Sequence, residues 1–213
     1  ILLSKDNNRD FFIKNKIGVA RNEKIILFAP TYRDNPNDSG LNQMQMIDFS
    51  KLMKELKTKF GGEWVFVYRI HQMSRKLIRD NLNKFISNDV KTRIIDGNNI
   101  EDMNEVLSIT DVLITDYSGA LYDFSLTKKP CFIFAHDFRS YQNNRGMNIN
   151  IFDLPFSISV TFEELLTNIK QFNQNKYEND IKDFLIQIGN VEDGKASKRV
   201  ADIIVSAMKK ERE

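Results

Sequence analysis

The sequence contains little of what marks several special classes of protein. Its 213 residues include a single cysteine, Cys131, which excludes an internal disulfide and any zinc site built from several cysteines. No run approaches the ~20 apolar residues that a membrane-spanning helix needs. Lys and Arg number 31 and Asp and Glu 29, for a net charge of +2. Bulk charge therefore does not indicate binding to nucleic acid or to a membrane surface.

Motifs for metal ions and for nucleotide phosphates are scarce as well. The chain has two histidines, His71 and His136, and no cluster of histidine, cysteine and carboxylate residues has the spacing of metal ligands. It also lacks a glycine-rich P-loop. The sequence therefore predicts a protein that uses neither a metal ion nor a cofactor.

What the sequence does contain is an alternation of short apolar runs with helical patterns. Continuous apolar runs such as residues 25–29 are typical of strands buried on both faces of a parallel sheet. The alternation predicts an α/β fold, a Rossmann-like doubly wound parallel sheet. We predict strands at residues 25–29, 64–68, 93–95, 111–115 and 131–135, and helices at residues 47–59, 75–82, 101–108, 118–127, 161–172, 177–188 and 196–210.

The remaining segments define the predicted domain organisation. Residues 1–24 are expected to be a linker or the end of a preceding domain, and residues 25–213 a single nucleotide-binding domain. Residues 136–155 are predicted to form a loop, long enough to suggest a function. Thr161 followed three residues later by Glu164 predicts a capping box at a helix start.

Polar residues follow the predicted strands, at the edge of the sheet where open α/β folds bind ligands. The set is partly cationic and includes both histidines of the chain. Its members are Pro30, Thr31, Arg33, Arg69, His71, Asp116, Ser118, Gly119, His136 and Asp137.

Three of these positions have competing interpretations. Ser118 and the N–H of Gly119 can form an anion site at a helix start, or Ser118 can simply cap the helix. Arg69 and His71, two residues apart at a strand end, can approach one diphosphate from the same side, or His71 is a surface histidine. For His136 a structural role is favoured over a functional one.

Six stretches of the chain together carry a family resemblance. They are residues 26–33 (ILFAPTYR), 68–71 (YRIH), 111–123 (DVLITDYSGALYD), 129–130 (KP), 145–146 (RG) and 193–199 (DGKASKR). In this order they resemble the C-terminal half of the CDP-glycerol glycerophosphotransferases, which polymerise wall teichoic acid and related capsule polymers. Taken singly, the stretch 193–199 also fits a turn followed by a helix cap.

The resemblance implies a fold and an activity. The chain would be the C-terminal, donor-binding half of a GT-B architecture, in a transferase that moves a polyol phosphate from a CDP-linked donor to a growing polymer without a metal ion. An N-terminal half, absent from these residues, would bind the polymer acceptor and supply the general base. Any membrane association, at the cytoplasmic face of the bacterial membrane, would come from that half, and no nucleic acid is an expected partner.

The resemblance also implies the donor site. His71 would contact the donor diphosphate as the catalytic residue. Gly119 stands where the family has a second serine, so a hydroxyl is lost but the N–H remains. The donor-binding residues would be Pro30, Thr31, Arg69, His71, Ser118, Gly119 and Asp123. Further possible site residues are Arg33, Asp116, His136 and Arg145.

Two other functions remain open on the sequence. One is a nucleotide-sugar transferase of the UDP type with the same architecture, in which Asp123 would hold the ribose. The other is a non-catalytic nucleotide-binding or scaffold domain. The sequence does not distinguish glycerol from ribitol as the transferred polyol.

Overall fold

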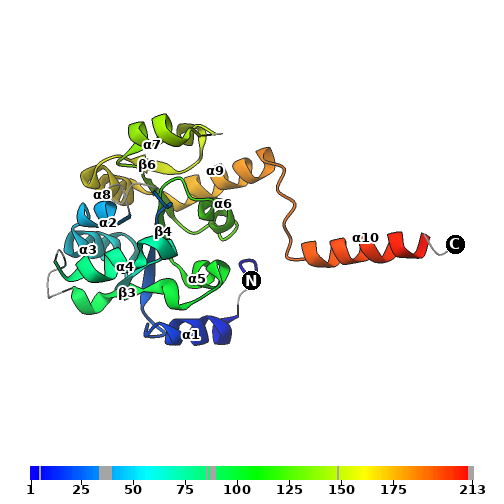
Figure 1. The fold of residues 1–213 in the computed structure, drawn as a ribbon, viewed down its shortest axis with the longest axis horizontal. Coiled ribbons are helices and arrows are strands. Elements are labelled where there is room, and N and C mark those ends of the chain that lie inside the picture. The colour runs from blue at the N-terminus through cyan, green and yellow to red at the C-terminus, as the bar shows by residue number, and fades with distance from the viewer. Residues whose placement is uncertain (5, 34–39, 85, 87–89, 148, 211–213) are drawn as a thin grey trace.

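A parallel β-sheet forms the centre of the molecule (Figure 1). The computed structural model describes residues 1–4, 6–33, 40–84, 86, 90–147 and 149–210. Within these residues the sheet has six strands in the order β3-β2-β1-β4-β5-β6, and each neighbouring pair is parallel. The strands are β1 (Lys24–Ala29), β2 (Trp64–Tyr68), β3 (Ile94–Asp96), β4 (Val112–Thr115), β5 (Cys131–Phe134) and β6 (Ser157–Ser159).

The strand order reverses between β1 and β4, so the chain winds outward in both directions from this pair. β1 pairs with β2 on one side and with β4 on the other. In doubly wound sheets the crevice beyond the carboxyl ends of the strands opens at this point, because successive helices leave toward opposite faces. The predicted Rossmann-like fold class is confirmed.

Helices cover both faces of the sheet (Figure 1). On one face lie α2 (Gly40–Gln45), α3 (Phe49–Phe60) and α8 (Phe162–Gln171), with α4 (Gln72–Asn81) packed beside α2. On the other lie α1 (Asn7–Lys16), α5 (Met103–Ile109), α6 (Ala120–Ser125) and α9 (Gln174–Gln187).

The central strands join two separate hydrophobic cores. Because side chains alternate across a strand, Ile25 and Leu27 of β1 pack into the core on one face, while Ile26 and Phe28 pack into the other. All four residues are at most 1% exposed. A strand buried on both faces needs an unbroken apolar run. For this reason the sequence predicted β1, β2, β4 and β5.

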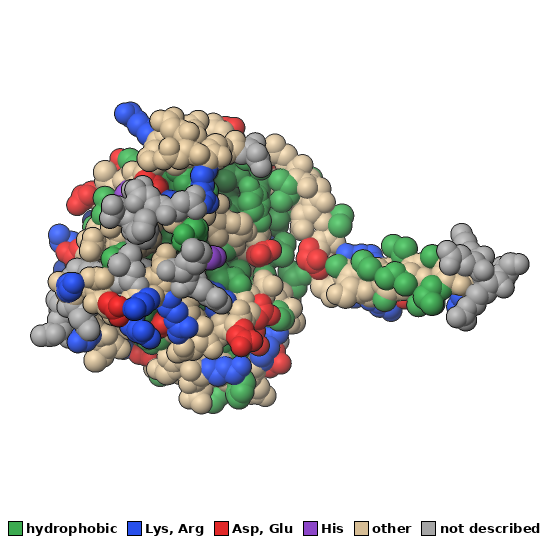
Figure 2. Space-filling model, viewed as in Figure 1, with side chains coloured by type: hydrophobic (Ala, Val, Ile, Leu, Met, Phe, Trp, Pro, Cys, Tyr) green, Lys and Arg blue, Asp and Glu red, His purple; other side chains and the backbone are tan. Residues whose placement is uncertain are grey.

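Two helices lie outside these layers. α7 (Phe138–Arg145) follows β5, and α10 (Ala196–Lys210) extends away from the rest of the molecule (Figure 1). Apolar side chains of α10 are exposed along its length (Figure 2), among them Val200, Ile203, Ile204, Val205 and Met208. No helix in the described part of the chain is both long enough and apolar enough to span a bilayer.

Several predicted elements differ from the structure. The loop predicted at residues 136–155 is wrong, because it contains α7 and the 3-10 turn Ile151–Asp153. The helices α1 and α2 and the edge strand β6 were not predicted. The helix predicted at residues 118–127 is shorter, and α3 begins at Phe49 because the Asp48 carboxylate caps it by accepting from the Lys51 N–H at 3.0 Å.

The predicted capping box and the predicted domain boundary have different outcomes. The capping box at α8 is confirmed: Thr161 Oγ1 accepts from the Glu164 N–H at 3.2 Å, and the Glu164 carboxylate accepts from the Thr161 N–H at 3.3 Å. Residues 1–24 include α1, and both Ile13 of this helix and Ile17 directly after it pack into one of the two cores. The domain boundary at residue 25 stays a prediction.

Candidate functional site

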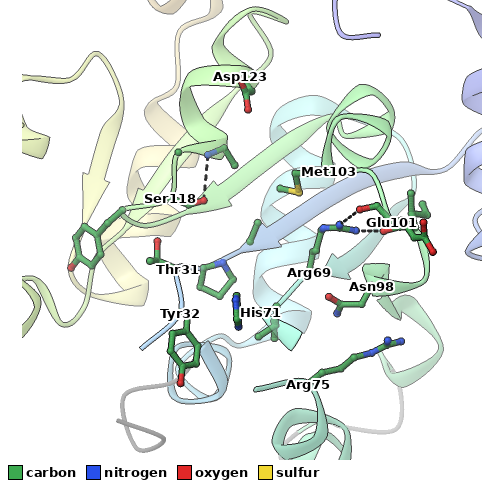
Figure 3. Close-up of a pocket in the computed structure, with 17 residues that line it drawn as sticks. Thr31, Tyr32, Arg69, His71, Arg75, Asn98, Glu101, Met103, Ser118 and Asp123 are labelled. Atoms are coloured by element: carbon green, nitrogen blue, oxygen red, sulfur yellow. Dashed lines mark hydrogen bonds between the residues drawn. The ribbon is translucent and has the colours of Figure 1, made fainter. Parts of the chain in front are cut away.

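A cavity of about 1150 Å³ opens beyond the carboxyl ends of β1, β2, β3 and β4 (Figure 3). It therefore lies where the strand order reverses. The structure brings seven predicted site residues together in its lining: Pro30, Thr31, Arg69, His71, Ser118, Gly119 and Asp123. The four further possible residues, Arg33, Asp116, His136 and Arg145, are not part of this lining.

A buried carboxylate fixes the two segments at the reversal point. Asp116 is fully buried, and its Oδ1 accepts hydrogen bonds from the Thr31 N–H at 2.7 Å and the Tyr117 N–H at 2.6 Å. These bonds tie the segment after β1 to the segment after β4. Thr31 and Ser118 are thereby presented together to the cavity (Figure 3).

Ser118 lies just before α6, whose N-cap residue is Gly119 and has no side-chain capping hydrogen bond. The Ser118 Oγ accepts a hydrogen bond from the Ala120 N–H at 3.3 Å, and anion binding at this helix start stays a prediction. The Ser118 side chain also lines the cavity, next to Gly119. α6 spans only six residues, so we assign no separate weight to its dipole.

His71 lies beside an aromatic ring that the sequence analysis did not single out. The rings of His71 and Tyr32 have their centroids 4.8 Å apart with an interplanar angle of 43°. Both side chains line the cavity (Figure 3), and His71 is exposed to it. The His71 imidazole thus faces the cavity beside the Tyr32 ring, in the segment after β2.

The Arg69 guanidinium is directed at backbone carbonyls. It donates to the carbonyl oxygen of Gly97 at 3.2 Å, to that of Glu101 at 2.6 Å and to that of Ile100. Burial lowers the pKa of Arg69, against the smaller opposing effect of Asp102 and Asp96. Since carbonyl oxygens are neutral, these bonds do not offset the positive charge of the guanidinium.

Acidic groups lie at other parts of the lining. Asp123 is on α6, and burial raises the pKa of its carboxyl group. Glu101 is exposed at the end of the loop after β3. The lining thus has the Arg69 guanidinium beside Glu101, and the Asp123 carboxyl group on α6 (Figure 3).

Arg33 belongs to a buried polar network behind the cavity. Its side chain is 6% exposed, with Nη2 2.7 Å from Asp116 Oδ2 and Nε 2.7 Å from Asp137 Oδ2. The guanidinium also lies over the rings of Tyr117 and Tyr141, at 5.0 and 4.7 Å from their centroids. Burial alone would lower the pKa of Arg33, but the two carboxylates raise it. Arg33 and Asp116 therefore support the site from behind.

Of the two other possible residues, His136 lies close to the same network. His136 Nδ1 is 3.9 Å from Asp137 Oδ1. Arg145 is the last residue of α7 and is exposed. In Asp137 the effect of burial, which raises the pKa, is outweighed by the hydrogen bond and charge of Arg33, so the pKa is lowered overall.

Sequence reasoning missed several residues of the lining. Asn98 and Glu101 follow β3, so the rule that selected the other strand ends would have found them had it been applied there. Arg75 lies on α4 and reaches the site only through the packing of that helix. The missed residues include Tyr32, Arg75, Asn98, Glu101, Met103 and Tyr117. Among the described residues, no group of three or more His, Cys, Asp or Glu side chains could hold a metal ion.

Comparisons with other proteins agree on one family. A family model described as CDP-Glycerol:Poly(glycerophosphate) glycerophosphotransferase matches residues 2–206. A teichoic acid poly(ribitol-phosphate) polymerase of Bacillus spizizenii is 31% identical over 97% of this chain and 32% of its own length. A teichoic acid poly(glycerol phosphate) polymerase of Staphylococcus epidermidis is 30% identical over 99% of this chain and 29% of its own length.

Solved structures of the wall teichoic acid polymerase TagF share the fold. One matches with a TM-score of 0.75 and 29% identity over 98% of this chain and 49% of TagF. Another, from a crystal soaked with CDPG, matches with a TM-score of 0.72 and 27% identity over 98% of this chain and 48% of TagF. The chain thus spans about a third of the two curated relatives and half of the TagF chain. It belongs to the CDP-glycerol:poly(glycerophosphate) glycerophosphotransferase family.

Proposed function

We propose that this chain binds the CDP-linked donor of a polyol-phosphate transferase. The observation that carries the proposal is the cavity at the reversal of the strand order, lined by residues from three of the family-like stretches, 26–33, 68–71 and 111–123. In the proposed reaction an acceptor hydroxyl attacks the β-phosphate of the donor. The bond between that phosphate and the bridging oxygen breaks, and CMP leaves.

We assign the phosphates of the donor to the part of the cavity formed by Thr31, His71 and Ser118. Phosphoryl transfer depends on positioning and on offsetting negative charge. His71, as the proposed catalytic residue, would donate a hydrogen bond to the diphosphate, and the Ser118 hydroxyl would add a second donor. The net charge of Arg69 would attract the anion without a metal ion, so we propose that donor binding is metal-independent.

The remaining parts of the activity lie outside these residues. We propose that an N-terminal GT-B half binds the polymer acceptor and provides the general base. Membrane association, at the cytoplasmic face of the membrane where CDP-linked donors occur, is assigned to the same half. The relatives named above include both ribitol-phosphate and glycerol-phosphate polymerases, so CDP-glycerol and CDP-ribitol are both proposed donors.

Calorimetry with a panel of nucleotides tests this function. We expect CDP-glycerol or CDP-ribitol, and CDP itself, to bind more tightly than UDP or a UDP-sugar, with binding unchanged in EDTA. Tighter binding of UDP would favour a nucleotide-sugar transferase. Binding that is lost in EDTA and returns with Mg²⁺ would contradict the metal-free proposal.

His71→Ala tests the proposed phosphate contact. A hydrogen bond to a charged group is worth about 1.5–3 kcal/mol, so we expect CDP-glycerol to bind roughly ten- to hundredfold more weakly. The thermal midpoint should not change, because His71 is exposed in a loop. His136→Gln is the matched control, since it changes the other histidine outside the lining. Wild-type affinity in His71→Ala would show that His71 does not bind the diphosphate.

A further inference from the structure

The loop between β3 and α5 forms one wall of the cavity, through Asn98, Ile100 and Glu101. We propose that Arg69 is a positioning residue, whose guanidinium holds this loop in the shape that seats the nucleoside of the donor. The proposal rests on the donor-binding function above and deepens it. It assigns a role to Arg69 beyond the attraction of the phosphates by its charge.

The first observation is the direction of the Arg69 side chain. Its Nη1 and Nη2 donate to three carbonyls of the loop, those of Gly97, Ile100 and Glu101. Figure 3 shows the guanidinium turned toward Glu101, on the side of the cavity away from Thr31 and Ser118. An arginine that served only the phosphates would direct these donors at the opposite part of the cavity.

The second observation is that the loop is held from its other side as well. Asp96 Oδ1 accepts hydrogen bonds from the Asn98 N–H at 2.9 Å and its Nδ2 at 2.7 Å. Arg75 Nε lies 3.2 Å from Asp96 Oδ2, and Arg75 Nη2 donates to Asn99 Oδ1 at 2.8 Å. Two arginines, one after β2 and one on α4, thus hold the same short loop.

The loop also has little room to move toward the sheet. A Cβ at Gly97 would lie 2.6 Å from Val67 Cγ1 and 3.3 Å from the Tyr68 carbonyl oxygen. The loop backbone at Gly97 therefore packs directly on β2. The hydrogen bonds from Arg69 hold the loop on the side that faces the cavity. A wall fixed in advance binds a ligand more tightly, because less freedom is lost on binding.

The chemistry of this wall fits a nucleoside better than a phosphate. Met103, which is half-buried, provides apolar surface for the face of a base, and the Asn98 amide offers polar groups to its edge. Glu101 can accept hydrogen bonds from ribose hydroxyls, whereas its carboxylate would repel a phosphate. Thr31, His71 and Ser118 lie on the other side of the cavity (Figure 3).

Arg69→Lys separates the two possible roles of the side chain. Lysine keeps the positive charge but lacks the planar fork that reaches several carbonyls at once. If Arg69 serves the phosphates through its charge, most of its effect on binding should remain in Arg69→Lys. If Arg69 holds the loop through its hydrogen bonds to the three carbonyls, that effect should be lost.

The test measures cytidine, CMP and CDP binding to the wild-type chain and to Arg69→Lys, by calorimetry or by NMR titration for the weaker ligands. We expect Arg69→Lys to weaken all three by the same factor, about tenfold, so that the ratio of the CMP and CDP dissociation constants is unchanged. His71→Ala should show the opposite pattern, with CDP affected and cytidine unaffected. Arg79→Lys, an exposed arginine on α4, is the control and should bind as wild type.

Hydrogen exchange provides a second readout that does not depend on affinity. In Arg69→Lys we expect faster exchange of the amides in residues 97–103, with exchange in β1 and β4 unchanged. In the wild type, CMP should slow exchange in the same residues. Faster exchange throughout the sheet would indicate a merely structural role for Arg69 and would overturn the inference.

The outcomes separate this inference from the proposed function. If wild type binds the cytidine ligands and Arg69→Lys binds them equally well, the positioning role of Arg69 is wrong, but the proposed donor site is supported. The same holds if the loss grows from cytidine to CDP, which would make Arg69 a phosphate ligand. If wild type binds none of the three, both proposals are wrong.

Discussion

Gly119 occupies a position where the backbone does not require glycine. Its φ and ψ are −57° and −18°, ordinary helical values, and a Cβ placed there would meet no atom within 4 Å. A Cβ can therefore be introduced beside the proposed phosphate position without backbone strain or collision. This makes Gly119 a suitable residue for a test of charge at the site.

Gly119→Asp is expected to weaken CDP binding at least tenfold, because its carboxylate would lie beside the donor phosphates. Like charges at about 4 Å repel by about 4 kcal/mol at an effective dielectric of 20. Gly119→Asn has nearly the same shape and no charge, so it should bind CDP within about threefold of wild type. Calorimetry measures the dissociation constant of CDP for both variants and for the wild type. Equal losses in the two variants would mean that the side chain blocks the site sterically, against the expectation.

At the scale of single residues, the sequence identified those that directly follow a strand. Thr31, Arg69, His71 and Ser118 could be selected because parallel strands all present their carboxyl ends to one edge. Arg33 follows the same rule but lies in a buried network. The sequence could not show this, because the partners Asp116 and Asp137 come from 83 and 104 residues further along.

At the scale of elements, α7 illustrates why the predicted loop at residues 136–155 was wrong. Its sequence, FRSYQNNR, has no apolar stripe, and no residue of the helix is buried. Tertiary contacts stabilise it instead: Tyr141 stacks on Tyr117 with ring centroids 3.9 Å apart, and Asp137, which precedes the helix, pairs with Arg33. β6 was missed for a related reason, because an edge strand of three residues, SIS, carries little apolar signal.

Arg33→Ala should destabilise the protein by about 3–5 kcal/mol, since it leaves the buried carboxylates of Asp116 and Asp137 without their cation. Asp116 is fully buried and Asp137 is 9% exposed. Chemical denaturation monitored by circular dichroism measures the change. α7 should also become more accessible to proteases, because its connection to the strand ends is lost.

Arg93→Ala is the matched control for Arg33→Ala. Arg93 pairs with Glu23 and Glu63 at 2.6 and 3.4 Å, but its side chain is 32% exposed. Exposed pairs contribute about 0–1 kcal/mol. A comparable loss of stability in the two variants would argue that the Arg33 network is no more important than a surface pair.

At the scale of the whole molecule, the sheet was predictable because its central strands are unbroken apolar runs. The reversal of strand order between β1 and β4 was predictable only as part of the fold class, since pairing depends on contacts between distant segments. The depth and lining of the cavity follow from that reversal together with the loop after β3. That loop is mostly polar and follows a strand of only three residues, so its fixed shape could not be predicted.

The whole molecule also buries several groups that must be protonated in the folded state. Burial raises the pKa of Tyr68 to about 12, and burial likewise raises the pKa values of Tyr117, Tyr177 and Cys131. In the unfolded chain these groups ionise near their ordinary values, about 10 for tyrosine and 8.5 for cysteine. Their contribution to stability is therefore complete below about pH 8.5 and is lost as the pH rises through the folded-state values.

The free energy of unfolding should accordingly fall steeply between pH 10 and 12. Tyr68→Phe should fall less steeply over that interval, because the variant lacks one proton that unfolding releases. One such proton corresponds to a slope of about 1.4 kcal/mol per pH unit. Urea denaturation of the wild type and the variant at pH 8, 10, 11 and 12 measures both slopes. Identical slopes would mean that Tyr68 ionises as readily in the folded protein as in the unfolded chain, and that its burial on β2 does not protect the phenol.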